Sequence, residues 1–338
     1  MDRVYTVGAL FSGIGGIELG FIKNGFNVLW SNDIDEAASV TYKTNHKIFN
    51  HEHIVQDIHT LKGKDLQPVD ILVGGFPCQA FSVAGYRKGF EDHRGNLFFE
   101  IMRLVNELKR KPKVLFLENV KNFYTHDHGN TFKVVTETLL DNGYYPFSDV
   151  LNTSSYTSIP QNRERTFIIA FNEGRDALNY RKNKMSHTFD QIFPPREKNK
   201  TDHIEKYLEK NKVDDKFYYG KEKYMYNDLK KIMKSRDTVY QWRRQYVREN
   251  KSDVCPTLTA NMGTGGHNVP LIVDDFGFRK LTPRECLNFQ GFPKNYKLPT
   301  EIATSQLYKQ AGNSVTVTLI SELAKLIKKA LDSKYAKI

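Results

Sequence analysis

The sequence predicts an α/β fold: a mostly parallel sheet flanked by helices, accompanied by a second, smaller domain. Apolar runs alternate with helix-like stretches from residue 4 to residue 171, as expected for a parallel sheet with crossover helices. Several runs are apolar throughout, as strands buried on both faces are. From residue 173 to about residue 250 the chain is polar, rich in Lys and Tyr, and weakly periodic. A separate unit is therefore expected there.

The elements of the sheet are expected in a regular order. The first strand, VYTVGALF at 4–11, leads into a glycine turn and an amphipathic helix at 17–24. The second strand, NVLWSND at 27–33, ends in an acid, and the third, VDILVGGFP at 69–77, ends in Gly-Gly-Phe-Pro. Further along the chain, apolar spacing predicts a helix at 97–110, strands at 113–120 and 165–172, and a final helix at 315–331.

The composition is that of a soluble globular protein with a polyanionic partner. Of the 338 residues, 39% are hydrophobic and 26% charged, and no run approaches the roughly 18 apolar residues of a membrane span. The formal net charge is +11, and residues 175–254 hold 21 Lys and Arg against 13 Asp and Glu. Basic residues mixed with aromatic ones suit contacts with nucleic acid. A solubilising surface domain is the alternative explanation of this composition.

The cysteines and histidines do not predict a disulfide or a metal site. Cys78, Cys255 and Cys286 are odd in number and far apart, which favours neither a disulfide framework nor zinc. A reducing cytoplasm is the expected setting. His126 and His128 have no evident third ligand nearby, so we expect a surface loop there and no metal.

Three glycines follow the first strand directly, in FSGIGG. Gly13, Gly15 and Gly16 would let the backbone approach a ligand closely at the carboxyl edge of the sheet. Asp33, at the end of the second strand, is placed to bind ribose hydroxyls. The pattern is neither G-x-G-x-x-G nor a phosphate loop, which favours an adenosine-bearing cofactor. Taken alone, these glycines are also compatible with a purely structural turn.

Two residues that end strands are candidates for chemistry. Cys78 follows the third strand and is itself followed by basic residues, which favour the thiolate and thus a nucleophile. Glu118 ends the next strand among apolar residues, where its pKa would be raised and it could donate a proton. The alternatives are a buried cysteine, which we expect for Cys255 and Cys286, and an ion-paired or helix-capping glutamate.

The chain resembles the bacterial DNA (cytosine-5) methyltransferases of restriction-modification systems. The motifs FSGIGG, GFPCQAFS, ENV, QNRER and GNSV occur in the family's order and separations, and RKLTPRECLNFQGFP precedes the last of them. The resemblance covers essentially the whole chain except residues 173–250. It implies a Rossmann-like fold of the kind that binds S-adenosylmethionine (AdoMet). It also implies a catalytic domain at 1–175 and 300–338 and a target-recognition domain at 176–299.

The resemblance also assigns the cofactor and its residues. The family uses AdoMet, which becomes S-adenosylhomocysteine. The implied cofactor-binding residues are Phe11, Gly13, Gly15, Asp33, Ile34, Asp57, Pro77, Asn313 and Ser314. At the position of Ile34 many relatives carry a Trp that packs against adenine, so we expect a different contact in this chain.

The implied reaction is covalent methyl transfer to C5 of a flipped cytosine. Cys78 would attack C6 while Glu118 protonates N3. Arg165 would contact O2 and Arg163 would support the site, and the two side chains should project to one side of a strand. A base inside a duplex is out of reach, so the target must leave the stack. The loop at 80–96, with its glycines and basic residues, would close over it.

Double-stranded DNA is the expected partner. The predicted DNA contacts combine residues of that loop with residues of the basic segment and its junction. They are Gln79, Ser82, Ala84, Arg87, Lys88, Arg94, Trp242, Arg243, Arg244, Arg248 and Thr257. We expect a monomer in the bacterial cytoplasm, near the nucleoid and not at a membrane, with a cognate restriction endonuclease implied by the family. The alternatives are a tRNA cytosine-5 methyltransferase and an inactive DNA-binding protein.

Overall fold

The computed structural model describes residues 3–77, 97–174, 177, 192–195, 201–223, 225–243, 246–250, 253–263 and 269–335. A seven-stranded sheet has the order β3-β2-β1-β4-β5-β8-β6. Its strands are β1 (Thr6–Leu10), β2 (Asn27–Asp33), β3 (Glu52–Val55), β4 (Ile71–Gly75), β5 (Val114–Val120), β6 (Tyr144–Asn152) and β8 (Glu164–Asn172). Strands β1 to β5 pair in parallel, and β8 is antiparallel to both β5 and β6. The predicted α/β fold with a mostly parallel sheet is confirmed.

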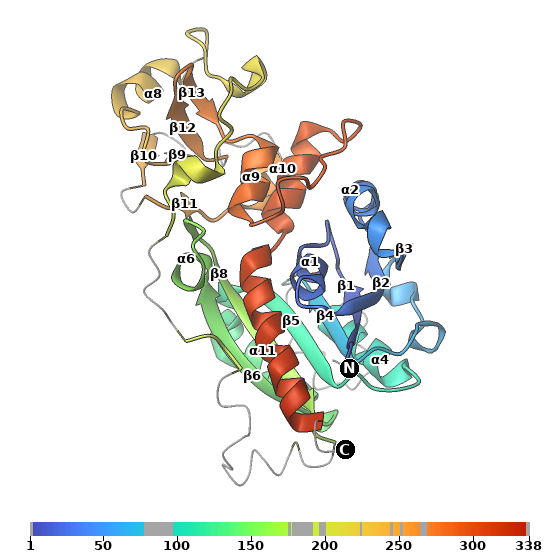
Figure 1. Cartoon of the computed structure of the whole chain (residues 1–338). Helices are drawn as coiled ribbons and strands as arrows, with labels where there is room; N and C mark the ends of the chain where they lie inside the picture. The colour runs from blue at the N-terminus through green and yellow to red at the C-terminus, as the bar shows by residue number, and fades with distance from the viewer. Residues whose placement is uncertain are drawn as a thin grey trace.

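Helices cover both faces of this sheet, and the two ends of the chain meet on one of them. The helices are α1 (Gly16–Ile22), α2 (Glu36–His46), α4 (Leu97–Glu107), α5 (Asn130–Asp141), α6 (Thr153–Tyr156), α8 (Tyr226–Ile232), α9 (Pro283–Phe289), α10 (Thr304–Asn313) and α11 (Val317–Tyr335). The C-terminal helix α11 lies beside α1 (Figure 1), and their apolar residues share one cluster. Helices α4 and α5 contribute to the cluster on the opposite face.

The two core clusters explain why the strands are apolar throughout. Along β5, Val114 and Phe116 belong to the cluster of α1 and α11, whereas Leu115 and Leu117 belong to that of α4 and α5. Side chains alternate between the faces of a strand, so a strand covered on both sides needs apolar residues at every position. Two strands, β3 and β6, were not predicted, and both lie at the edges of the sheet.

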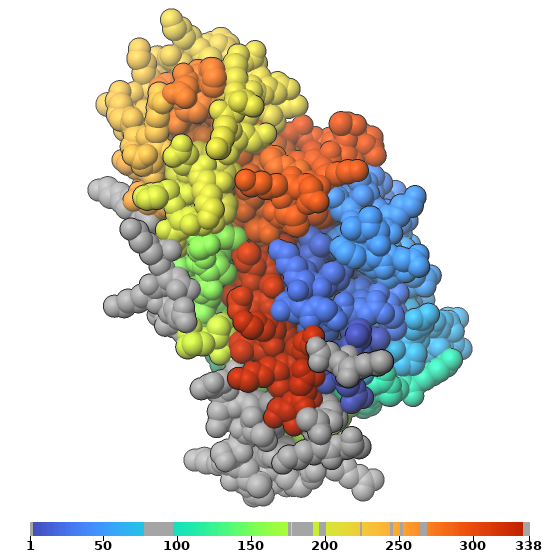
Figure 2. Space-filling model, viewed as in Figure 1, coloured from blue at the N-terminus to red at the C-terminus, as the bar shows by residue number. Residues whose placement is uncertain are grey.

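A second sheet forms in the later part of the chain. Its order is β10 (Tyr246–Glu249), β9 (Tyr240–Arg243), β12 (Leu271–Asp274) and β13 (Gly277–Lys280), with every pair antiparallel. The chain from about residue 200 to 280 gathers at one end of the molecule (Figure 2). Below this sheet, β11 (Cys255–Pro256) pairs with β7 (Gln161–Asn162).

The later segment packs against the glycine turn and helix α1 through a common apolar cluster. This cluster unites Ile14 and Leu19 near the first strand with Val239 and Leu258 of the later segment. A buried ion pair also fixes β13 to α9: the Arg279 guanidinium contacts both carboxylate oxygens of Glu285 at 2.7 Å. The boundaries at residues 175/176 and 299/300 stay a prediction. Within the described part of the chain, no helix combines the length and apolarity needed to cross a membrane.

Candidate active site

A cavity of about 610 Å³ opens where strands β1, β2, β4 and β5 end. Their carboxyl ends meet at one edge because these strands are parallel, which is where open α/β sheets bind ligands. Ten predicted site residues line this cavity: Phe11, Gly13, Asp33, Ile34, Pro77, Glu118, Arg163, Arg165, Asn313 and Ser314. Residues at opposite ends of the sequence are thereby brought to one site.

The glycine turn after β1 is held by the acid that ends β2. The Asp33 carboxylate accepts hydrogen bonds from the backbone amides of Gly13 at 2.6 Å and Asp35 at 2.8 Å. Burial raises the pKa of Asp33, and these two amides oppose that shift. Phe11 and Gly13 both have positive φ, 54° and 51°, a conformation that Gly adopts readily and Phe only at a cost. Asp33 therefore shapes the turn in addition to lining the cavity.

Two residues of the predicted cofactor set do not line the cavity. A Cβ on Gly15 would collide with the Nε2 atom of His46 on α2, so glycine is required there for the close approach of that helix. Asp57 instead begins the short 3-10 helix η2 (Ile58–Thr60), where its side chain accepts a hydrogen bond from the amide of His59 at 2.9 Å. At these two positions the structure gives the residue a role in the local backbone: Gly15 allows the close packing of α2, and Asp57 caps η2.

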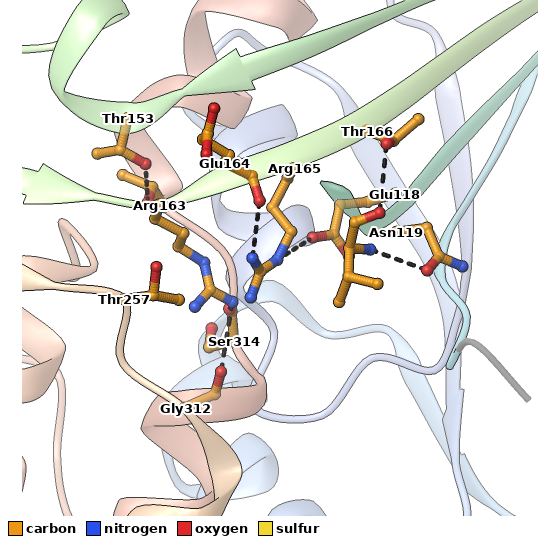
Figure 3. A network of polar contacts seen from close by, with 12 residues as sticks. Glu118, Asn119, Thr153, Arg163, Glu164, Arg165, Thr166, Thr257, Gly312 and Ser314 are labelled. Carbon is orange, nitrogen blue, oxygen red and sulfur yellow. Dashed lines mark hydrogen bonds and ion pairs between the residues drawn. The ribbon is translucent and has the colours of Figure 1, made fainter. Parts of the chain in front are cut away.

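Glu118 and Arg165 form an ion pair at the wall of the cavity. The buried Glu118 carboxylate lies 3.1 Å from Arg165 Nε, across the β5–β8 pair (Figure 3). Burial raises the pKa of Glu118, although Arg165 and then Arg163 favour its charged form. A Cβ on the neighbouring Gly75 would lie 3.1 Å from Glu118 Oε2. The carboxyl group is thus fixed beside the end of β4.

Arg163 has a different role from Arg165, although both line the cavity. Its guanidinium donates hydrogen bonds to the carbonyls of Leu258, Gly312 and Ser314, at 2.8 Å for Leu258 and 3.3 Å for Gly312. It is almost completely buried, and in Figure 3 its side chain is directed towards Gly312 and Ser314. Arg163 therefore joins the strand β8 region to the end of α10, which carries the predicted cofactor residues Asn313 and Ser314.

Asn119 was quoted in a motif but not predicted as a site residue. Its side-chain amide donates a hydrogen bond to the Phe76 carbonyl at 2.9 Å. Phe76 precedes Pro77, and Pro77 is bonded to Cys78, so Asn119 fixes the backbone that leads to the predicted nucleophile. The ENV motif contained this residue, and an Asn side chain can both donate and accept hydrogen bonds.

Comparison with known proteins identifies the family. The family model for C-5 cytosine-specific DNA methylases matches residues 5–329. The chain belongs to this family. The methylase is 49% identical over 328 residues to the Type II methyltransferase M.Bsp6I of Bacillus sp. (strain RFL6), with 96% of this chain and 99% of that protein covered. The predicted family and enzyme class, a DNA (cytosine-5-)-methyltransferase, are confirmed.

More distant relatives and solved structures agree with this assignment. The methylase is 35% identical over 343 residues to the Type II methyltransferase M.HhaI of Haemophilus parahaemolyticus, with 96% and 94% of the two chains covered. The crystal structure of the S. pombe Dnmt2 methyltransferase superposes with a TM-score of 0.72 at 18% identity, covering 98% and 100% of the two chains. At that identity the likeness concerns the fold, which is that of AdoMet-dependent methyltransferases.

Several predicted residues of the methylase lie outside the described residues. They are Cys78, Gln79, Ser82, Ala84, Arg87, Lys88, Arg94 and Arg244. Thr257 is described, and its hydroxyl donates a hydrogen bond to the Asn162 carbonyl at 2.5 Å, joining the β11 segment to β7.

The predicted DNA contacts on β9 and β10 divide between the two faces of the hairpin. Trp242 is 6% exposed and packs with Val247 in the core of the second sheet. Arg243 and Arg248 are exposed, and Tyr246, paired with Arg243, is 59% exposed. Side chains alternate along a strand, and the polar neighbours of Trp242 did not reveal that its own face is buried. The DNA contacts of this hairpin stay a prediction.

Glu18 provides a test of stability against pH in the methylase. This carboxyl on α1 is fully buried, and burial raises its pKa to about 7. Below pH 4.5, the pKa of the carboxyl in the unfolded chain, the group is protonated in both states and does not lower the free energy of unfolding. As pH rises from 4.5 to about 7, the unfolded chain loses this proton first, so the free energy of unfolding falls. We expect the change in the free energy of unfolding caused by Glu18→Gln to be about 3 kcal/mol more favourable at pH 8 than at pH 4.5.

Urea unfolding at both pH values measures this difference. The matched control is Glu36→Gln, since Glu36 is exposed on α2 and its replacement should change stability by less than about 0.5 kcal/mol. An effect of Glu18→Gln that is equal at the two pH values would contradict the prediction.

Proposed function

We propose that the protein transfers the methyl group of AdoMet to C5 of a cytosine flipped out of a specific short duplex DNA sequence, through a covalent bond between Cys78 and C6. The observation that carries the proposal is the shared cavity. Glu118, paired with Arg165, lines the same space as the glycine turn, Asp33 and Pro77. An acid, a cofactor-type turn and the residue bonded to the nucleophile therefore converge on one site.

The residues of the cavity fit AdoMet. A volume of about 610 Å³ is within the range for pockets that hold a ligand of this size. Gln310 lines the cavity, and its Nε2 atom is buried without a hydrogen-bond partner among the described residues. A buried donor without a partner is costly in a protein, and a polar ligand would satisfy it. Asp33 would bind the ribose, Ile34 would lie against adenine, and Asn313 and Ser314 would complete the site.

The chain supplies the groups that activate the base. Cys78 Sγ forms a bond to C6 while Glu118 donates a proton to N3, so the electron pair of the C5–C6 double bond becomes available at C5. AdoMet, when bound, supplies the methyl group that C5 accepts. Solvent water accepts the C5 proton, the N3 proton returns to Glu118, and the C6–S bond breaks to release the Cys78 thiolate, which restores the ring. Arg165, which holds Glu118, would also contact the O2 atom of cytosine, and Arg163 keeps the cavity wall in place.

Access to the base and its recognition complete the proposal. The target cytosine must leave the duplex, and we assign closure over it to the loop at 80–96. Sequence recognition belongs to the segment 176–299, where the exposed Arg243 and Arg248 are suited to contact guanine edges or phosphates. We also infer that the enzyme acts as a monomer on chromosomal DNA in the bacterial cytoplasm. The Type II names of its relatives support a cognate restriction endonuclease.

Incubation with AdoMet carrying a labelled methyl group tests the proposal. The substrates are genomic DNA amplified in vitro, which carries no methylation, and unmodified tRNA. We expect label in duplex DNA alone, recovered as 5-methylcytosine after digestion to nucleosides, with bisulfite sequencing giving the recognised site. Label in tRNA alone would favour the tRNA alternative, and label in neither substrate would overturn the proposal.

A further inference from the structure

An ion pair in the lining of the cofactor cavity joins two distant parts of the sequence. Lys309 Nζ, on α10, lies 2.8 Å from Asp35 Oδ2, at the beginning of α2. Both residues line the cavity. Asp35 follows Ile34, whose side chain is 63% exposed at the same place. The pair therefore stands beside the part of the cavity assigned to the ribose and adenine.

The Asp35 carboxylate is held in position before it meets Lys309. Its Oδ1 atom accepts a hydrogen bond from the Ala38 amide at 3.0 Å, which caps α2 and leaves Oδ2 for Lys309. Although partial burial works in the opposite direction, the hydrogen bonds from Lys309 and the helix amides lower the pKa of Asp35. The carboxylate thus stays charged at neutral pH, with one oxygen committed to each partner.

Helix α10, which presents Lys309, is itself fixed from two sides. Gln310 Oε1 accepts a hydrogen bond from Thr41 on α2 at 2.9 Å. On the other side, η9 (Ala260–Gly263) packs so closely that a Cβ on Gly263 would lie 3.3 Å from Lys309 Cβ and collide with the Ser305 carbonyl. Lys309 therefore reaches Asp35 on α2 from a rigidly held helix.

We propose that Lys309 is a positioning residue that, through its ion pair with Asp35, holds the mouth of the cavity closed around bound AdoMet and slows its release. This inference rests on the proposed function. In the free protein the pair is partly exposed, and exposed pairs contribute little to stability. A bound ligand excludes water from the mouth and strengthens the same attraction, so the pair acts on cofactor retention more than on folding.

Three variants test the pair with little disturbance of its surroundings. Asp35→Asn keeps a good helix-capping side chain and removes the charge, and Lys309→Met keeps the aliphatic stem beside Gly263. The third is the double variant. The probes are S-adenosylhomocysteine in calorimetry and AdoMet in stopped-flow release and steady-state kinetics. We expect each single variant to raise the dissociation constant, the release rate and KM for AdoMet about fivefold, with a smaller change in kcat.

The double variant separates this proposal from its alternatives. It should bind about as weakly as either single variant, because the interaction is lost only once. If the losses in the two single variants added up in the double variant, the residues would act independently and the proposal would be overturned. It would also be overturned if Lys309→Met bound more weakly while Asp35→Asn bound as the wild type does, because Lys309 would then act on the cofactor directly. Lys325→Met, an exposed lysine on α11, serves as the control. Unchanged binding in all variants overturns this inference alone, whereas a wild-type protein that binds neither compound overturns the proposed function.

Discussion

The Cys78→Ser variant is expected to lose methyl transfer to duplex DNA by at least a factor of about a thousand, together with the covalent adduct. A serine hydroxyl is almost entirely protonated at neutral pH and is a far weaker nucleophile than a thiolate. Without the bond to C6, the C5 atom of cytosine does not gain the electron density that methyl transfer needs. The loss should therefore appear in kcat and leave cofactor binding in place.

A duplex containing 5-fluorocytosine at the methylated position makes the adduct visible. Fluorine at C5 cannot leave as the proton does, so the wild-type protein should remain attached to the DNA in a denaturing gel. The Cys78→Ser variant should show no such species while binding S-adenosylhomocysteine as the wild type does. Cys255→Ala is the matched control, because burial raises the pKa of the Cys255 thiol well above its ordinary value and a buried thiol is a poor nucleophile. An undiminished rate in Cys78→Ser would rule out the covalent mechanism.

The central strands could be predicted from the sequence, whereas the edge strands could not. Strands β1, β2, β4, β5 and β8 lie inside the sheet, where both faces are covered, and each appears as a largely apolar run. Strands β3 and β6 lie at its two edges. Most β6 residues are only partly buried, and it includes Pro146 and Asp149, which are tolerated at an edge. Such a strand has no distinctive pattern in a single sequence.

The candidate site was predictable where it depends on topology and not where it depends on distant partners. Asp33 and Glu118 end parallel strands, so their meeting at one edge follows from the fold. The ion pair of Lys309 with Asp35 joins residues 274 positions apart, and no local pattern marks it. The contacts of Arg163 with three carbonyls were hidden for the same reason. The sequence predicted that Arg163 supports the site, but it did not reveal that the partners are carbonyls of Leu258 and of the end of α10.

Replacement of Glu118 by Gln is expected to reduce kcat about 10²- to 10⁴-fold, the usual loss when a general acid is removed. The side chains have nearly the same shape, and the amide oxygen can still accept a hydrogen bond from Arg165, so the cavity wall should persist. What is lost is the proton for N3 of cytosine. Dissociation constants for S-adenosylhomocysteine should therefore change less than about twofold, and urea unfolding should show that the variant is folded.

The pH dependence distinguishes a proton donor from a residue that only positions the base. Because burial raises the pKa of Glu118, the fraction able to donate a proton is larger at neutral pH than for an exposed glutamate, and it falls as pH rises through that pKa. The wild-type rate should show this alkaline decline, and the residual rate of Glu118→Gln should lack it. Glu164→Gln is the control, since Glu164 neighbours Arg165 but pairs with the exposed Lys121 and should keep the wild-type profile. If Glu118→Gln retained both the rate and the decline, the proton would have to come from another group.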